Sequence, residues 1–306
     1  MGKAARASAS RRTRTQPDSA RQTDSARQKL AAEAAAAQRR AQVRRRLLVA
    51  GGSVAIVLVF VAALIVVKLN GSGAPVTPKA AQTDPRVADE VTSVPAGTFN
   101  AVGAGSATGL KALSGVPELT ADGKPEVLYI GGEFCPFCAA ERWAIAAALS
   151  RFGTLSGVRF IYSSPTDGDI PTLTFYKSSY TSKYLSFVPV EWFGEADDPS
   201  TPFGHVYLQQ PTSQEAALFA RYANGSIPFL DIANRYLLPQ TQYPPTDIAS
   251  LSWAQIAAAM HDPASQVAKD IDGAANTLTA AMCTLTHGQP TTVCTSAAVK
   301  AAAAST

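Results

Sequence analysis

The chain has 306 residues, a length that allows one or two domains, and its formal net charge is +4. This average conceals an uneven distribution, because residues 1–46 contain 13 of the 27 Lys and Arg residues and three acids. The rest of the chain therefore has a net negative charge, which excludes a basic globular domain. The excess of positive charge belongs to an N-terminal tail.

Residues 1–46 are predicted to form a basic cytoplasmic tail. Residues 1–24 lack large apolar side chains and are expected to be disordered. Residues 25–46 contain strong helix formers and neither Gly nor Pro, which predicts a helix toward the membrane. An Arg-rich tail could bind nucleic acid, but its place beside an apolar span favours topology and anionic lipid as the explanation. No nucleic-acid partner is expected.

Residues 47–69 are predicted to form a transmembrane helix in the lipid bilayer of the cell membrane. They contain a single charge, Lys68, and at about 1.5 Å per residue they span roughly 30 Å. Arginines gather before the span, so the positive-inside rule places the N-terminus in the cytoplasm and the C-terminal domain outside. A cleaved signal peptide is disfavoured, since both its basic and apolar regions would be too long.

A linker over residues 70–86, rich in Gly, Ser, Pro and Thr, is expected to lead into a domain over residues 87–285. The domain begins with two short pieces that read as extended, at 90–94 and 98–102. A turn at 121–125 precedes the regular pattern.

The centre of the domain reads as strand, helix and strand. Apolar runs predict strands at 127–131 and 158–162, and apolar residues on one face predict a helix at 139–151. Because the return connection is short, the two strands are predicted to form a right-handed parallel crossover. Glu141 and Arg142 are expected at the surface of the helix.

Residues 163–210 are rich in aromatic residues among Ser, Lys and Pro, and they read as an irregular insertion. Their aromatic side chains are expected to pack into a local hydrophobic core. The alternative is that they form a binding surface, or platform, for unfolded client chains. Thr212 and Glu215 predict a capping box at the start of a helix that ends at Gly225. A hairpin is expected over 226–238.

The remaining residues are Ala-rich and predict three helices, at 253–261, 263–284 and 296–304. Four cysteines, all after the span, suit an oxidising compartment. Cys283 and Cys294 bracket a turn, which favours a structural disulfide that stabilises the fold by roughly 2 to 4 kcal/mol. Residues 286–306 would then be a helical extension stapled by this disulfide. The alternative is a shuttle pair that accepts electrons from Cys138.

The sequence Cys135-Pro136-Phe137-Cys138 places two thiols at a strand-to-helix turn. Unpaired N–H groups and the macrodipole at a helix N-terminus favour negative charge, which lowers the pKa of the leading thiol. Cys135 is therefore the candidate nucleophile and Cys138 the resolving partner. The alternatives are a static disulfide or half of a zinc site, for which the chain offers no second pair at suitable spacing. No metal, nucleotide or flavin cofactor is expected.

The order of the predicted elements resembles that of the thioredoxin fold. The elements are a strand, the helix that begins with Cys-Pro-Phe-Cys, a second strand, the insertion, a helix, Ile227-Pro228, a hairpin and a helix. An α/β, thioredoxin-like domain with a long insertion before a cis-proline is therefore expected. The stretch GKPEVLYIGGEFCPFCAAERWA is similar to an uncharacterised family of membrane-anchored, thioredoxin-like prokaryotic proteins with a Cys-Pro-Phe/Tyr-Cys motif. The resemblance implies that Cys135 attacks, Cys138 resolves, and Pro228, in cis, presents the backbone of Ile227 to an extended substrate.

Two positions depart from the thioredoxin pattern. Tyr129 stands where thioredoxins keep a buried acid, and the dipeptide Pro136-Phe137, an expected part of the substrate-binding surface, lacks the His of envelope oxidases. Glu133 is either a solvated acid or a proton relay that takes part in catalysis, although its charge would raise the pKa of Cys135. A pKa of Cys135 that is only moderately lowered is expected.

These features predict a membrane-anchored, extracytoplasmic thiol-disulfide oxidoreductase. Its partners would be envelope or secreted client proteins, together with a membrane redox partner. A non-catalytic thioredoxin-fold binding or scaffolding module of the envelope is the first alternative, and a metal-delivery protein is the second.

Overall fold

The computed structural model describes residues 79–108 and 110–304. The predicted tail (1–46) and the predicted transmembrane helix (47–69) lie outside the described residues. Among the residues that are described, no helix combines the length and the apolar character needed to cross a membrane.

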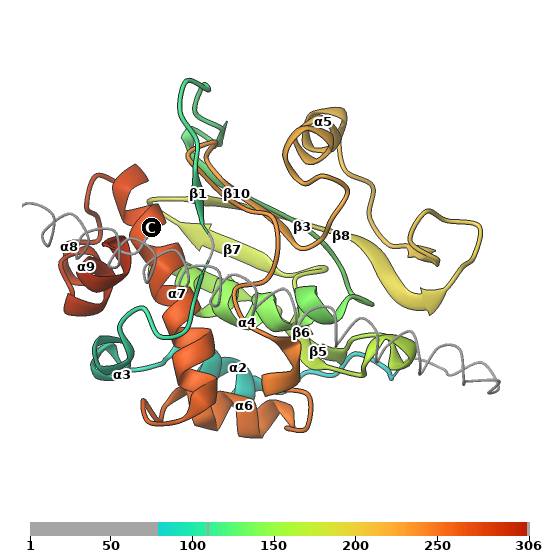
Figure 1. Cartoon of the computed structure of the whole chain (residues 1–306), viewed down its shortest axis with the longest axis horizontal. Coiled ribbons are helices and arrows are strands. Elements are labelled where there is room, and N and C mark those ends of the chain that lie inside the picture. Colours follow the sequence, from blue (N-terminus) through green and yellow to red (C-terminus); the bar gives the residue numbers. More distant parts are fainter. Residues whose placement is uncertain (1–78, 109, 305–306) are drawn as a thin grey trace, which may run out of the picture. The chain divides into compact units, whose positions relative to one another are not determined.

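A mixed β-sheet forms the centre of the described domain (Figure 1). Its strands run in the order β1 (Lys111–Ala112), β11 (Tyr236–Leu238), β10 (Phe229–Ile232), β3 (Lys124–Gly132), β8 (Ser186–Asp197) and β9 (His205–Tyr207), and β2 (Thr120–Ala121) also pairs with β3. Strands β3 and β8 run parallel, and the other paired strands are antiparallel. The prediction of an α/β fold is confirmed.

Helices and two small sheets surround this centre. The helices are α2 (Pro85–Thr92), α3 (Ala96–Val102), α4 (Pro136–Ser150), α5 (Ser213–Tyr222), α6 (Trp253–Met260), α7 (Gln266–Leu285), α8 (Thr291–Cys294) and α9 (Ala297–Ala303). The small antiparallel sheets pair β4 (Gly153–Ser156) with β7 (Ser179–Ser182), and β5 (Arg159–Tyr162) with β6 (Pro171–Thr174). Two short 3-10 helices, η1 (Pro165–Asp167) and η2 (Pro245–Asp247), complete the elements.

Strand β3 is buried on both faces because helices cover both sides of the sheet. Its side chains alternate, so that Val127 and Tyr129 join a larger core with α4 and α7, whereas Leu128 and Ile130 join a smaller core with α5. Figure 1 shows α5 on the opposite side of the sheet from α4 and α7. The end of β3 therefore emerges between two covered faces.

The parallel partner of β3 corrects the predicted crossover. That partner is β8, which lies inside the segment 163–210 that was expected to be irregular, whereas the strand expected at 158–162 is β5, paired antiparallel with β6. Pro189 and Glu191 interrupt the apolar pattern of β8 and hide it in the sequence. Strands β4 to β7 therefore lie in the sequence between the two parallel strands, β3 and β8, and not after the second of them.

The two pieces predicted as extended, at 90–94 and 98–102, overlap the end of α2 and lie within α3, so that prediction is wrong. Helix α2 begins because the side chain of Asp84 accepts a hydrogen bond from the N–H of Val87 at 3.1 Å. Val87 and Val91, one helical turn apart, are both buried. The buried residues repeat with the period of a helix. Because α2 has only eight residues and glycines follow it, this pattern is too short to be recognised in the sequence.

Other local predictions are confirmed. Thr212 and Glu215 form the capping box at the start of α5, with each side chain bonded to the backbone N–H of the other residue. Strands β10 and β11 form the hairpin, and Ala233 and Asn234 at its turn have positive φ angles of 54° and 55°. This hairpin fixes the loop that precedes β10.

The C-terminal part is helical, as predicted. Helices α6, α7 and α9 correspond to the three expected helices, and α7 begins after Ser265, whose side chain caps it. A disulfide joins Cys283 to Cys294 with 5.5 Å between the Cα atoms, which confirms the predicted pairing. The peptide bond between Gln289 and Pro290, inside this loop, is cis.

Candidate active site

The two cysteines of the Cys-Pro-Phe-Cys sequence lie at the N-terminus of α4, directly after β3. Cys135 is the N-cap residue, and its Sγ accepts a hydrogen bond from the backbone N–H of Cys138 at 3.3 Å. Pro136 occupies the first turn, where its missing N–H costs nothing. Both cysteines are free thiols, and their exposed fractions are 4% for Cys135 and 0% for Cys138.

The loop before β10 faces the first thiol. Cys135 Sγ lies 3.9 Å from the carbonyl oxygen of Ile227, and the Ile227–Pro228 peptide bond is cis, as expected. Ile227 is half-buried and Pro228 is buried, while Phe137 on α4 is half-buried. The structure therefore brings together the thiols and the Ile227-Pro228 pair, which lie about ninety residues apart in the sequence.

Arg142 is buried, so the prediction that it lies at the surface is wrong. It follows Cys138 by four residues, which places both on one face of α4. Its Nε and Nη2 bind the two carboxylate oxygens of Glu191 at 2.8 and 2.7 Å, and both side chains have an exposed fraction of 0%. Nη2 also donates to the carbonyl oxygen of Gly132 at 2.8 Å. A bidentate ion pair thus ties α4 to β8 and to the end of β3.

Glu141 is buried as well, against the same prediction. Its Oε2 accepts hydrogen bonds from the N–H of Gln242 at 2.9 Å and from the hydroxyl of Thr241 at 3.1 Å. Burial raises the pKa of Glu141 to about 7, although these hydrogen bonds lower it. The sequence carried a signal that was missed, because α4 is apolar around its whole circumference except at Glu141 and Arg142. Such a helix is buried, and its charges need internal partners.

The groups around the two thiols shift their pKa values in opposite directions. Burial opposes ionisation of Cys135, but the Cys138 thiol, the N–H groups of Cys138 and Phe137, and the charge of Arg142 together lower the pKa of Cys135 below its ordinary value. Burial and the neighbouring Cys135 raise the pKa of Cys138 well above its ordinary value, and Arg142 opposes that rise. At neutral pH Cys135 is therefore the better nucleophile of the two.

Glu133 is not the solvated acid that one reading expected, because its side chain is buried. Its Oε1 accepts a hydrogen bond from the hydroxyl of Thr174 at 2.5 Å. Burial and the nearby charge of Glu191 raise its pKa, which the Thr174 hydrogen bond and Arg142 counteract. A proton-relay role for Glu133 stays a prediction.

Tyr129 lies among these groups and cannot act as a base. It is fully buried, its hydroxyl has no hydrogen-bond partner among the described residues, and its ring centroid is 5.9 Å from the guanidinium carbon of Arg142. Burial raises its pKa well above the ordinary value for a phenol. Tyr129 therefore offers no carboxylate to accept the proton of Cys138.

Aromatic side chains lie beside Cys135. Phe134 stacks on the ring of His205, with ring centroids 3.9 Å apart, and contacts Phe193 and Phe203 at 6.3 and 6.1 Å. Tyr207, next to this cluster, is exposed by 47%. Residues 163–210 were predicted to form an aromatic core or a platform. Aromatic side chains of their β8–β9 hairpin lie beside the turn that carries Cys135.

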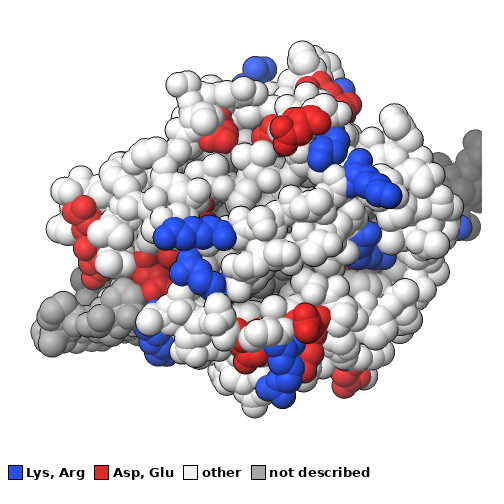
Figure 2. Space-filling view, turned by 180° about the vertical axis from the view of Figure 1, so that it is seen from behind, with Lys and Arg blue, Asp and Glu red and all other residues white. Residues whose placement is uncertain are grey.

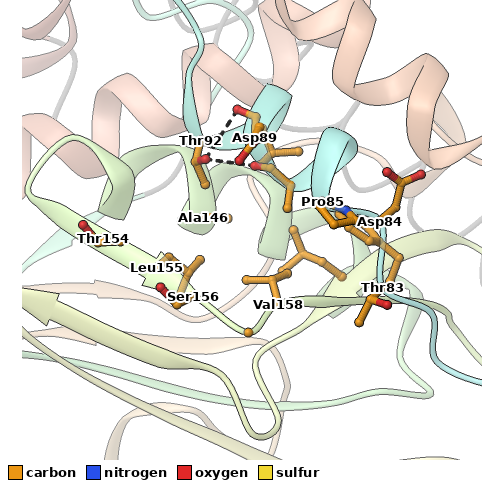
Figure 3. A pocket seen from close by; sticks show the side chains of 15 residues that line it. Thr83, Asp84, Pro85, Asp89, Thr92, Ala146, Thr154, Leu155, Ser156 and Val158 are labelled. Atoms are coloured by element: carbon orange, nitrogen blue, oxygen red, sulfur yellow. Dashed lines mark hydrogen bonds between the residues drawn. The ribbon is translucent and has the colours of Figure 1, made fainter.

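Other surfaces of the domain do not join this site. A cavity of about 460 Å³ lies between α2, α4 and β4 (Figure 3), and neither Cys135 nor Cys138 lines it. Within residues 79–108 and 110–304, no group of three or more His, Cys, Asp and Glu side chains is arranged to hold a metal ion. On the face in Figure 2, basic and acidic side chains are interspersed among uncharged residues, and neither sign forms a continuous patch.

Comparison with known proteins identifies the family. Residues 114–284 match the model of the family described as Domain of unknown function (DUF929), and this range covers more than half of the chain. The match includes both thiols of the motif, the Arg142–Glu191 pair and Cys283, but not Cys294. No curated protein and no solved structure matches the chain. The chain therefore belongs to the DUF929 family.

Proposed function

We propose that this protein is a thiol-disulfide oxidoreductase that acts on cysteine-containing client proteins through Cys135 and Cys138. The observation that carries the proposal is the position of Cys135 Sγ. It lies at the N-terminus of α4, accepts the N–H of Cys138 at 3.3 Å, and approaches the carbonyl oxygen of Ile227 at 3.9 Å. The helix N-terminus and the N–H of Cys138 favour the thiolate of Cys135, and the thiolate is the species that attacks disulfides.

The exchange has two halves. The Cys135 thiolate attacks one sulfur of a client disulfide, forming a mixed disulfide, while the other client sulfur leaves as a thiolate and takes a proton from water. Cys138 then loses its proton and attacks Cys135 Sγ, which releases the second client sulfur. The client gains two electrons and two protons, and Cys135 and Cys138 become a disulfide. Oxidation of a client dithiol is the reverse sequence.

The order of the elements supports a thioredoxin-like fold as part of the proposal. Strand β3, helix α4, parallel strand β8, helix α5, the Ile227-Pro228 loop, the β10–β11 hairpin and helix α7 follow one another as the resemblance implies. In this proposal the extra strands β4 to β7 are inserted before β8. In the fold that the resemblance implies, the two cysteines lie directly after the central strand.

The proposed location is outside the cytoplasm, on a single membrane anchor. The apolar sequence of residues 47–69 and the arginines before it support this orientation. The Cys283–Cys294 disulfide is also consistent with an oxidising compartment. Clients would then be envelope or secreted proteins, and a membrane protein would restore the redox state of the pair.

Trapping in cells tests the proposal. The full chain with Cys138→Ala cannot complete the second half of the exchange, so we expect client proteins to accumulate as disulfide adducts of Cys135 that a reductant releases. The Cys135→Ala, Cys138→Ala double variant is the matched control and should trap none. Absence of any adduct, together with a Cys135 that does not react with alkylating reagents at neutral pH, would refute the oxidoreductase.

The burial of the two thiols favours one second candidate, a binding module of the envelope in which the pair does not exchange. Exposed fractions of 4% and 0% restrict access to the sulfur atoms. That candidate predicts a Cys135–Cys138 disulfide that resists mild reductant, and full biological activity of the Cys135→Ser, Cys138→Ser double variant. The oxidoreductase predicts the opposite result in both experiments.

A further inference from the structure

We infer that Arg142, held by Glu191, is a positioning residue that stabilises the thiolate of Cys138 during the second half of the exchange. This inference rests on the proposed function, because Cys138 attacks only if Cys135 has first formed a mixed disulfide. In thiol-disulfide exchange the attacking group must lose its proton. The fully buried Tyr129, whose pKa is raised, does not favour that loss, whereas a nearby positive charge does.

The guanidinium is fixed next to the motif by its hydrogen bonds. Nη2 of Arg142 and the N–H of Cys135 both donate to the carbonyl oxygen of Gly132, at 2.8 and 3.1 Å. Arg142 also stands one helical turn after Cys138 on α4. The cation is therefore tied to the same turn that carries the first thiol and to the same helix face as the second.

One edge of the guanidinium stays free. Glu191 binds Nε and Nη2, whereas Nη1 is buried and has no hydrogen-bond partner within the described part of the chain. A buried donor without a partner is unfavourable, and a thiolate formed nearby would relieve that cost. The ion pair thus holds Arg142 in place without occupying all of its donors.

The other charged and titratable groups around Arg142 weaken its effect on the thiols but do not reverse it. They are Glu191 from β8, Tyr129 and Glu133 from β3 and the turn after it, Glu195 from β8, and the two cysteines themselves. Burial and the nearby Glu133 raise the pKa of Glu195 to about 8, and burial raises that of Glu133. Both acids are thereby displaced toward their neutral forms, and Arg142 lowers the pKa of both thiols.

A small disulfide isolates the step that Arg142 should control. The reduced full chain is mixed with oxidised glutathione, samples are quenched with acid, and mass spectrometry follows the adduct between Cys135 and glutathione. Its decay reports the attack of Cys138. In the Arg142→Met, Glu191→Met double variant, which leaves no unpaired buried charge, we expect decay about tenfold slower or more at pH 7, equivalent to a rise of at least about one pKa unit.

Three further variants separate this role from a structural one. Arg142→Lys keeps the charge and should restore most of the rate. Glu191→Gln keeps a hydrogen-bond acceptor but removes the competing negative charge, so the adduct should decay faster than in the wild type. Arg151→Met removes a half-buried arginine at the C-terminal end of the same helix that bonds to Asn276 and Thr279, and should match the wild type.

The inference is overturned if the folded double variant releases glutathione at the wild-type rate with the same pH profile. If the double variant does not fold, the Arg142→Gln, Glu191→Gln double variant decides, because it removes both charges while the two side chains can still hydrogen-bond, and release at the wild-type rate there would also overturn the role. The readout needs no client protein. Should trapping in cells find no client while these rates differ as expected, the proposed function fails and the role of Arg142 stands.

Discussion

The two cysteine pairs of this chain lie at opposite ends of helices. Cys135 and Cys138 are free thiols at the N-terminus of α4, whereas Cys283 and Cys294 form a disulfide at the C-terminal ends of α7 and α8. A helix N-terminus stabilises a nearby thiolate, and a C-terminus disfavours it. Arg142 adds a positive charge to the first pair.

This difference shows why cysteine spacing alone is an incomplete guide to function. The first pair is surrounded by groups that favour the thiolate of Cys135, the species that the proposed exchange requires. The second pair closes a loop with a sequence separation of 11 and ties the end of α7 to the C-terminal helices. The family match ends between Cys283 and Cys294, so this disulfide also links the family region to the sequence beyond it.

Substituting cysteines in the first pair and in the second pair should have different consequences for activity, and this is the largest effect we expect. Cys135→Ser should abolish reduction of a disulfide-containing test protein such as insulin by the reduced full chain, because no nucleophile remains. The Cys283→Ser, Cys294→Ser double variant should keep the wild-type rate. Equal loss of activity in both variants would make the second pair part of the reaction.

The buried ion pair should matter to stability only when it is broken on one side. Arg142→Met alone leaves the carboxylate of Glu191 buried without its cation and should lower the free energy of unfolding by about 3 to 5 kcal/mol. The Arg142→Met, Glu191→Met double variant should recover most of that loss. Urea unfolding followed by circular dichroism measures both, and equal destabilisation of the single and double variants would contradict this account.

The second cysteine pair should act on stability and not on chemistry. Reduction of the Cys283–Cys294 disulfide, or its removal by Cys283→Ser and Cys294→Ser, should lower the free energy of unfolding by about 3 kcal/mol for a loop of this length. The same denaturant titration on the wild type with and without reductant is the control. An unchanged unfolding midpoint would show that the staple does not hold the C-terminal helices.

The smallest expected effect is a dependence of stability on pH. Burial raises the pKa of Glu141 from 4.5 to about 7, so the folded state binds more protons than the unfolded state between these values. Its contribution to stability is present below about pH 4.5 and is lost as the pH rises through about 7. Burial raises the pKa of Asp272 to about 8, in the same direction.

Unfolding midpoints in urea at pH 5 and pH 8 measure this dependence. The midpoint should fall between the two, and Glu141→Gln, which cannot ionise, should flatten the change. A wild-type midpoint that rises toward pH 8 would show that other groups outweigh these carboxyls.

Local features of the fold could be predicted because their causes are local. The capping box of Thr212 and Glu215 lies within four residues, and the Cys-Pro-Phe-Cys turn follows directly from a buried strand. The Ile227-Pro228 loop came from a resemblance in element order, and the structure places it 3.9 Å from Cys135.

The missed features depend on partners that are distant in sequence. Glu191 is 49 residues from Arg142, and nothing in the local pattern pairs them. Strand β8 escaped notice because Pro189 and Glu191 break its apolar alternation, although β3 pairs in parallel with residues 186–193 of it. The partner of Arg142 follows from that pairing, so the missed strand concealed what holds the cation that lowers the pKa of both thiols.

One measurement tests the contrast between the two pairs most directly. The full chain is equilibrated in glutathione buffers from strongly reducing to strongly oxidising, and differential alkylation with mass spectrometry reports the state of each pair. We expect Cys135 and Cys138 to pass reversibly from dithiol to disulfide across this range while Cys283 and Cys294 stay bonded. A Cys135–Cys138 pair that remains in one state throughout, or two pairs that titrate together, would contradict the account.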